Sequence, residues 1–261
     1  MKASSVDKAT KDVLKDLESS QGIHTVGDSI DRGISMVVYA DPGVGKTTLA
    51  GTLPPGETLI ISTEAGIGPL LGTNHNVFDL YGQNVEKLED LYKYLRTGNH
   101  PFKYVVLDNI SELEQRILSS LTQRRGKEFT EIKEYGDSAF KMREYLHLFR
   151  DLVYQNITVI FNAWEFLLDV KQDGGILITR TFPKLSRKLA PEVCGIVDVV
   201  GHLEVHEKSG KRWLRIGPSA QYITKTQFKG LDDGELADLP ALLTKLYSYN
   251  YKQGEEDGGK D

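Results

Sequence analysis

The segment Ala40-Asp41-Pro42-Gly43-Val44-Gly45-Lys46-Thr47-Thr48 decides the fold. It follows a short β-branched run, Ile34 to Tyr39, and it leads into Lys46 to Leu53, which has the pattern of a helix stopped by Pro54 and Pro55. The order of strand, Gly-rich loop and helix matches the phosphate-binding loop (P-loop), with alanine at the first position, where glycine is usual. The sequence therefore predicts a site for the phosphates of a nucleotide.

Each residue type in this loop suits contact with a polyphosphate. Gly43 and Gly45 leave backbone N–H groups accessible, and the following helix adds the positive end of its dipole. Lys46 is expected to reach the β and γ oxygens, while the Thr47 hydroxyl binds Mg²⁺. A Gly-rich turn that only caps a helix is the alternative. We predict that the nucleotide is held by Asp41, Pro42, Gly43, Val44, Gly45, Lys46, Thr47 and Thr48.

Two acidic residues follow apolar strands and are candidates for the metal and for catalysis. Asp108 directly follows the apolar strand Tyr104 to Leu107, the position of a Walker-B acid that helps to hold Mg²⁺. The alternative is that Asp108 only caps the next helix. Glu64 follows the strand Thr58 to Ser62, at a position that suits a general base that activates water near the γ-phosphate. A surface carboxylate that caps a helix is the alternative for Glu64.

A polar residue also follows a later strand. Asn162 comes directly after Ile157 to Phe161, where an amide could sense the γ-phosphate by hydrogen bonding. Its neighbour Glu165 could take that role instead. The alternative for Asn162 is that it closes a turn.

Strands alternate with helices in the first part of the chain. Strands are predicted at Ile34–Tyr39, Thr58–Ser62, Val77–Leu80, Tyr104–Leu107 and Ile157–Phe161, and helices at Val85–Leu95, Ser111–Leu121 and Ala139–Tyr154. This order predicts an α/β fold with a mostly parallel sheet flanked by helices. After Ala163, antiparallel hairpins are predicted at 166–170 with 176–182 and at 197–206 with 212–216, followed by a helix over Asp238–Tyr247. The expected domains are an N-terminal helix and linker (1–33), an ATPase core (34–250) and an acidic disordered tail (251–261).

Composition and charge limit the classes of function. The chain has 261 residues, a net charge of −5 and one cysteine, Cys194, which cannot form an internal disulfide or a CxxC metal cage. A reducing cytoplasm is therefore expected, and the short apolar runs predict no membrane partner. Residues 170–229 contain eleven Lys and Arg against five acids, a net of +6, so the remainder carries −11. This imbalance is compatible with one anion-binding surface, although solvated loops also collect basic residues.

Missing motifs narrow the class of nucleotide. A GTPase would have DxxG after Asp108 and NKxD for guanine, whereas Thr224-Lys225-Thr226-Gln227 lacks the final Asp. No LSGGQ motif and no Arg-rich lid of small-molecule kinases is present in the sequence. ATP is therefore the expected nucleotide, and a metabolic kinase is disfavoured.

Several segments together resemble the RecA-like ATPase core, and more narrowly the phage-encoded ATP-binding proteins that consist of this core alone. The matching segments are YADPGVGKTT (39–48), LIISTEAG (59–66), YVVLDNISEL (104–113), VIFNAWEF (159–166), FPKLSRKLAPEVCGIVDVVGHLEV (182–205) and YITKTQFKG (222–230). The resemblance implies a RecA-like P-loop fold over about Ile34 to Tyr247. It also implies Mg²⁺-dependent ATP hydrolysis, with Glu64 as the catalytic glutamate.

The resemblance further implies single-stranded DNA as a partner and assembly of several copies. Loops after the central strands would line a DNA channel, and Lys225 would reach the ATP of an adjacent subunit. The basic candidates for phosphate contact are Arg124, Arg125, Lys127, Arg180, Lys184, Arg187 and Lys188, and the aromatic candidates for base stacking are Phe129, Tyr135 and Phe182. Ordinary solvated or core roles are the alternatives for these residues.

Two functions follow from these observations. The first is an ATP-dependent recombination or annealing protein of phage type, acting in a bacterial cytoplasm, for which a single-strand-binding protein is a further candidate partner. The second is a nucleotide-dependent switch or loader that acts through a replication protein and has little DNA affinity of its own. The negative net charge favours the second function.

Overall fold

The computed structural model describes residues 32–126, 129–171, 177–228 and 231–256. The chain divides into one unit of residues 32–246 and a second unit made of residues 1–31 and 247–261. The helix predicted near the N-terminus lies outside the described residues. The first unit contains the sheet and the predicted site.

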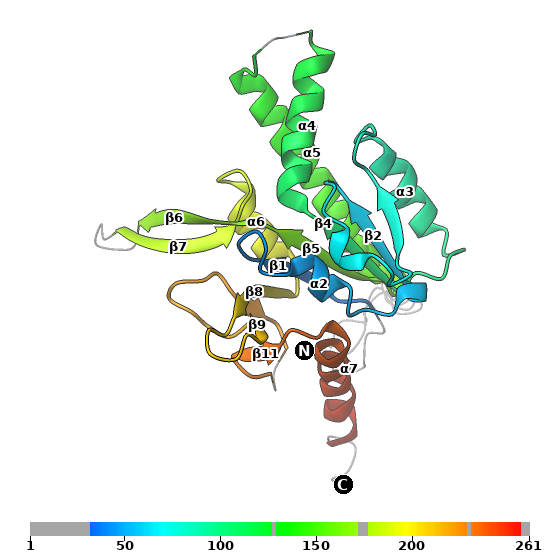
Figure 1. The fold of residues 1–261 in the computed structure, drawn as a ribbon, viewed down its shortest axis with the longest axis vertical. Helices are drawn as coiled ribbons and strands as arrows, with labels where there is room; N and C mark the ends of the chain where they lie inside the picture. Colours follow the sequence, from blue (N-terminus) through cyan, green and yellow to red (C-terminus); the bar gives the residue numbers. More distant parts are fainter. Residues whose placement is uncertain (1–31, 127–128, 172–176, 229–230, 257–261) are drawn as a thin grey trace, which may run out of the picture. The chain divides into compact units, whose positions relative to one another are not determined.

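The described strands and helices follow the alternating order that the sequence predicts (Figure 1). The strands are β1 (Ser35–Tyr39), β2 (Thr58–Ser62), β3 (Asn76–Asp79), β4 (Tyr104–Asp108), β5 (Thr158–Ala163), β6 (Glu165–Lys171), β7 (Leu177–Pro183), β8 (Val199–Val205), β9 (Arg212–Arg215), β10 (Lys225–Thr226) and β11 (Gly234–Leu236). The α-helices are α2 (Lys46–Ala50), α3 (Lys87–Arg96), α4 (Ile110–Arg124), α5 (Ile132–Arg150), α6 (Leu189–Ile196) and α7 (Leu239–Glu256). Short 3₁₀ turns lie at Pro55–Glu57, Gly68–Leu70 and Asp151–Gln155.

The main sheet confirms the predicted fold class. Over the described residues it has nine strands in the order β11-β9-β8-β1-β5-β4-β2-β3, with β10 paired to β8. The six strands from β8 to β3 are parallel, and β9, β10 and β11 add antiparallel pairs at one side. The P-loop strand β1 is central, so parallel strands on both sides end at the same edge as the loop. In open α/β sheets, ligands bind at this carboxyl edge.

Both predicted hairpins form, but they differ in their place in the fold. Strands β6 and β7 make a separate two-stranded sheet that projects from the main sheet in Figure 1. Strand β8 instead joins the main sheet, because it pairs in parallel with β1 through Met36 and Val199 and antiparallel with β9. The second hairpin therefore lies beside the P-loop.

Helices cover both faces of the sheet, because side chains of its buried strands alternate between two apolar clusters. Val37 and Tyr39 belong to the cluster under α3, α4, α5 and α6. Met36 and Val38 belong to the cluster on the other face, with apolar residues of α2 and of the start of α7. Burial of β1 on both faces explains why its sequence is continuously apolar rather than alternating.

The helices differ from prediction mainly at their ends. Helix α5 begins at Ile132 rather than Ala139, because Glu131 and Glu134 form a reciprocal capping box at its start. Helix α7 continues past Tyr247 to Glu256, and no proline follows Pro240 to stop it. Helix α6 was not predicted, since Pro191 and Gly195 are poor helix formers. Within the described residues, no helix has the length and apolar character needed to cross a membrane.

Candidate nucleotide-binding site

The P-loop has the backbone conformation that its glycines allow. Gly43 and Gly45 have φ values of +84° and +113°, in the left-handed region that disfavours other residues. Helix α2 begins at Lys46, and Leu49 donates its backbone N–H to the Gly45 carbonyl at 2.9 Å. The loop therefore turns directly from β1 into the helix, as the motif predicts.

Lys46 folds back over its own loop. Its ammonium group donates to the carbonyl oxygens of Ala40 at 2.8 Å and Asp41 at 2.9 Å, and the residue is only 7% exposed. Burial lowers the pKa of Lys46, and the carboxylate of Asp108 opposes that shift. Neutral carbonyl groups are weaker partners for an ammonium ion than phosphate oxygens, so this lysine is suited to exchange them for a polyphosphate.

Thr47 and Asp108 meet at the carboxyl edge of the sheet. The Thr47 hydroxyl donates to Oδ2 of Asp108 at 2.6 Å, although the two residues are 61 positions apart in the chain. Burial raises the pKa of Asp108, and the hydrogen bonds from Thr47 and Asn162 act in the opposite direction. Asp108 does not cap α4, because Asn109 is the N-cap and accepts the Glu112 N–H at 2.7 Å. Its carboxylate is therefore directed to the site.

The oxygen atoms of Thr47 and Asp108 fit a magnesium ion. Mg²⁺ prefers hard oxygen ligands and commonly retains several waters, so a hydroxyl, one carboxylate and the substrate phosphates suffice. The described residues contain no group of three His, Cys, Asp or Glu side chains that could hold a metal by themselves. A metal at this edge would accordingly be shared with a bound nucleotide.

Glu64 lies beside this pair because β2 and β4 end in register, with Ser62 opposite Asp108. Its Oε1 atom accepts a hydrogen bond from Nδ2 of Asn109 at 2.9 Å. Burial, followed by the neighbouring Asp108 carboxylate, raises the pKa of Glu64. The structure thus brings together Glu64 and Asp108, and it adds Asn109 as a residue that positions Glu64.

Asn162 also reaches Asp108. Its Nδ2 atom donates to Oδ1 of Asp108 at 3.2 Å, as expected from the parallel pairing of β4 and β5. Oε2 of Glu165 instead accepts a hydrogen bond from Nε2 of His202 at 2.6 Å. The His202 ring is buried and stacks on Tyr222 with centroids 3.9 Å apart.

Lys225 lies away from the P-loop. It is opposite Val200 in the β10–β8 pair, and its ammonium group donates to the carbonyls of Gly195 at 2.8 Å and Val197 at 2.6 Å. These carbonyls lie at the C-terminal end of α6, where a cation is favoured by the helix dipole. The structure therefore gives Lys225 partners within its own chain, and its contact with the ATP of an adjacent subunit stays a prediction.

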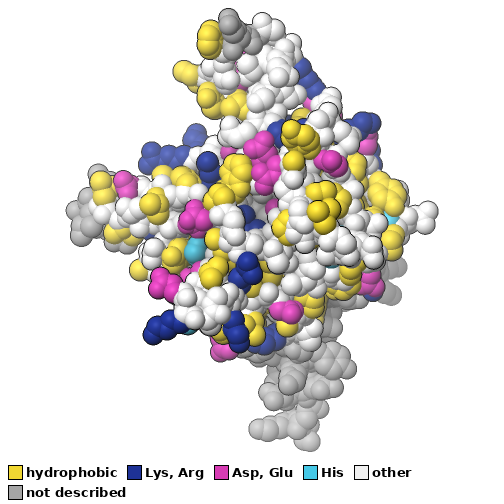
Figure 2. All heavy atoms as spheres, in the orientation of Figure 1, with side chains coloured by type: hydrophobic (Ala, Val, Ile, Leu, Met, Phe, Trp, Pro, Cys, Tyr) yellow, Lys and Arg dark blue, Asp and Glu magenta, His cyan; other side chains and the backbone are white. Residues whose placement is uncertain are grey.

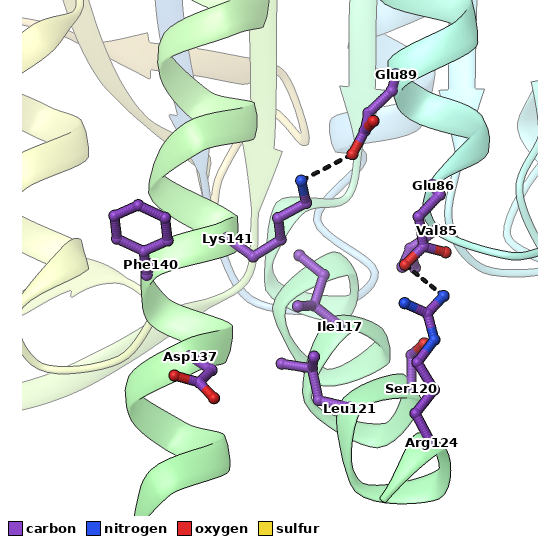
Figure 3. Close-up of a pocket in the computed structure, with 10 residues that line it drawn as sticks. All are labelled: Val85, Glu86, Glu89, Ile117, Ser120, Leu121, Arg124, Asp137, Phe140 and Lys141. Carbon is purple, nitrogen blue, oxygen red and sulfur yellow. Dashed lines mark hydrogen bonds and ion pairs between the residues drawn. The ribbon is translucent and has the colours of Figure 1, made fainter.

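Three of the predicted DNA-contacting arginines have partners within the chain. Arg124 forms an ion pair with Glu86 at a cavity of about 460 Å³ between α3, α4 and α5 (Figure 3). Arg125 pairs with Glu134 at 2.6 Å, and Arg180 donates to the carbonyl of Ser219 at 2.7 Å. These contacts orient the guanidinium groups toward the protein.

The remaining basic candidates are exposed or lie outside the described residues. Lys184, Arg187 and Lys188 are exposed in the segment between β7 and α6, and Lys127 is not described. Among the aromatic candidates, Phe129 and Tyr135 are exposed, whereas Phe182 is 7% exposed and packs in the core. The prediction that Phe182 stacks on bases is therefore wrong, because its ring is not accessible.

Arg212 is a residue at the site that the sequence did not indicate. It begins β9, and its Nε atom donates to the carbonyl oxygen of Val44 in the P-loop at 2.6 Å. Basic residues are frequent between 170 and 229, so nothing in the sequence alone distinguished this arginine from its neighbours.

Comparison with known proteins agrees with this geometry. Residues 32–228 match a protein-family model described as an AAA domain. A comparison with curated proteins gave no match.

Proposed function

The chain belongs to this AAA family of P-loop ATPases, because the family model matches most of the length of the chain. We propose that the protein couples Mg²⁺-dependent ATP hydrolysis to the binding of single-stranded DNA. Membership of this family supports a nucleotide-binding function of the kind found in ATPases. The observation that carries the hydrolytic part is the contact between Thr47 and Asp108 at 2.6 Å, with Glu64 beside it.

The P-loop residues would bind and orient the triphosphate. Lys46 would transfer its hydrogen bonds from the carbonyls of Ala40 and Asp41 to phosphate oxygens, where its charge offsets charge that develops during transfer. Thr47 and Asp108 would hold Mg²⁺, which supplies further electrostatic stabilisation of the phosphates.

Glu64 is the proposed general base. Its raised pKa makes it a better proton acceptor than an ordinary carboxylate, and the hydrogen bond from Asn109 fixes one of its oxygens. A water oriented by Glu64 would attack the γ-phosphorus. Asn162 would contribute through Asp108, because the Asn162 amide holds the carboxylate oxygen that does not bond to Thr47.

The DNA-binding part of the proposal rests on the exposed segment between β7 and α6. Lys184, Arg187 and Lys188 are exposed there, and Lys and Arg side chains gather above the β6–β7 hairpin in Figure 2. Lys184 also lies over the Trp164 ring, 5.2 Å from its centroid. Since Trp164 follows Asn162 by two residues, this basic surface is connected to the nucleotide site by a short stretch of backbone. We propose that several copies assemble on a DNA strand and promote annealing or recombination.

A second function, the nucleotide-dependent switch or loader, is favoured by the ion pairs. Arg124 and Arg125 are neutralised by Glu86 and Glu134, so the α4–α5 end is less available to phosphates than its sequence implies. In this case the protein would act through a protein partner and would bind DNA weakly.

The two functions are tested by measuring the ATPase rate with and without oligo-dT, together with anisotropy of labelled oligo-dT across a salt series. The variant Lys184→Ala/Arg187→Ala/Lys188→Ala should bind at least tenfold more weakly and show a salt slope smaller by about 2, since each phosphate contact contributes roughly 0.7. The matched variant Arg124→Ala/Arg125→Ala should bind almost as the parent does.

Equal loss of affinity in the two variants would contradict the proposed location of the DNA surface. A parent protein that binds no oligo-dT at low salt, and whose ATPase rate does not respond to it, would support the switch or loader. Light scattering with ATP and oligo-dT tests assembly, and a monomer under these conditions would contradict it.

A further inference from the structure

Arg212 lies directly over the P-loop. Its Nε atom donates to the carbonyl oxygen of Val44 at 2.6 Å. A Cβ atom at Gly45 would lie 2.5 Å from that nitrogen and 3.1 Å from Cζ. The guanidinium group therefore packs against the backbone of the two residues that immediately precede Lys46.

The backbone of Arg212 is fixed by hydrogen bonds on both sides of β9. It pairs with Val205 of β8, and its carbonyl oxygen accepts the N–H of Ala237 at 3.1 Å. The turn before it is closed by Gly210, with φ of +66°, which donates its N–H to the His206 carbonyl at 2.8 Å. The side chain is exposed, so it can change partners while the backbone stays in place.

A cavity begins beside the guanidinium group. It has a volume of about 310 Å³ and is lined by Thr48 and Thr52 of the P-loop helix region, by Arg212 and by Asp238. The start of α7 is tied to this wall, because Leu239 donates its N–H to Oγ1 of Thr52 at 3.1 Å. A cavity of this volume is at the lower end of the range for small-molecule sites.

The chemistry of arginine suits this place. A guanidinium group carries five N–H donors in one plane, and the bond to Val44 uses one of them. Its bonds to phosphate oxygens are charge-assisted and about twice as strong as bonds between neutral groups. A triphosphate that follows the P-loop backbone passes next to Val44 and Gly45, within reach of this side chain.

We propose that Arg212 is a phosphate-binding residue of the nucleotide site, supplied by β9 of the same chain, and that the adjacent cavity receives the nucleoside. On binding, the guanidinium group exchanges the Val44 carbonyl for a phosphate oxygen. This inference rests on the proposed ATP binding. The competing role is a structural clamp, in which the bond to Val44 only holds the P-loop in shape.

The two roles differ in what they require, because a clamp needs an N–H donor whereas a phosphate contact needs positive charge. Arg212→Lys keeps the charge, Arg212→Gln keeps a neutral donor, and Arg212→Ala removes both. The control is Lys208→Ala, which removes an exposed cation from the same turn. Each protein is titrated with Mg-ATP by calorimetry, and its melting temperature is measured alone.

We expect the Gln and Ala variants to bind Mg-ATP about tenfold or more weakly, since hydrogen bonds to charged groups contribute that much or more. The Lys variant should stay within about threefold of the parent, and Lys208→Ala should match it. Melting temperatures should be similar, because the Arg212 side chain is exposed.

Parental affinity in Arg212→Gln, or in Arg212→Ala, would overturn the proposal. Inorganic tripolyphosphate tests the cavity: the parent should bind it more weakly than ATP, and equal affinities would exclude the cavity from the site. If the parent bound no Mg-ATP, and thus did not differ from Lys46→Ala, the proposed ATPase function itself would fail, independently of Arg212.

Discussion

The replacement Glu64→Gln separates nucleotide binding from hydrolysis. Glutamine has nearly the same shape as glutamate, and its side-chain oxygen can still accept the Asn109 hydrogen bond, which is 2.9 Å long in the parent. The substitution removes the negative charge and the capacity to take a proton from water. It leaves Lys46, Thr47 and Asp108 unchanged, so the phosphates and the metal should bind as before.

The expected loss of rate follows from the proposed role of Glu64. Removal of a positioned general base lowers a rate typically by 10² to 10⁴, or about 2.7 to 5.4 kcal/mol of barrier at 1.36 kcal/mol per decade. The affinity for Mg-ATP should not fall and is expected to rise slightly, because two neighbouring carboxylates become one. Burial is the larger cause of the raised pKa of Glu64, and repulsion by the Asp108 carboxylate adds to it.

The measurement is a single-turnover hydrolysis assay with enzyme in excess, combined with calorimetric titration of Mg-ATP. The matched control is Glu112→Gln, the same chemical change in the first turn of α4, which should hydrolyse ATP at the parental rate. A parental rate in Glu64→Gln would refute the assignment of the base. Equal losses in both variants would show that the effect is one of general charge.

Three further substitutions test the surrounding structure. Asp108→Asn should hydrolyse ATP at least a hundredfold more slowly than the parent. Its unfolding midpoint should lie at an equal or higher denaturant concentration, because burial raises the pKa of Asp108 and the ionised carboxylate opposes folding at neutral pH. Asp198→Asn should lower the free energy of unfolding by about 3 kcal/mol, since Asp198 accepts hydrogen bonds from Arg32 at 2.9 Å and Ser35 at 2.8 Å. Those bonds lower the pKa of Asp198. In the parent this stabilisation is therefore present above about pH 3.9 and is lost as the pH falls through the lower folded-state pKa. Urea unfolding should show that the free energies of unfolding of the parent and of Asp198→Asn are closer at pH 3 than at pH 7. Lys225→Met should lower the free energy of unfolding in urea by about 1 to 3 kcal/mol and leave the ATPase rate normal. A normal stability with a reduced rate would instead support the predicted contact of Lys225 with the ATP of an adjacent subunit.

The P-loop and its two acids were predictable because their chemistry follows from local sequence and from one rule of topology. Gly45, Lys46 and Thr47 are adjacent in the chain, so their spacing alone defines the loop. Glu64 and Asp108 each end an apolar strand, and parallel strands bring such ends to one edge of the sheet. Neither step requires knowledge of the order of distant strands.

Arg212 and Lys225 depend on that order. Arg212 is 168 residues from Val44, and it reaches the loop only because β9 pairs with β8 and β8 with β1. Lys225 lies in the same basic stretch of residues 170–229, but the antiparallel pairing of β10 places it opposite Val200, away from the carboxyl edge. The two cations thus lie in different surroundings because of the pairing of their strands.

The central place of β1 also has a consequence for synthesis of the chain. Residues Ser35 to Tyr39 leave the ribosome before any of their partners, because those in β5 are 124 residues later and those in β8 later still. At 5 to 20 residues per second, β1 waits roughly 6 to 25 seconds for its first neighbour. Throughout that interval an apolar strand has two unpaired edges, the condition under which nascent chains aggregate or recruit chaperones.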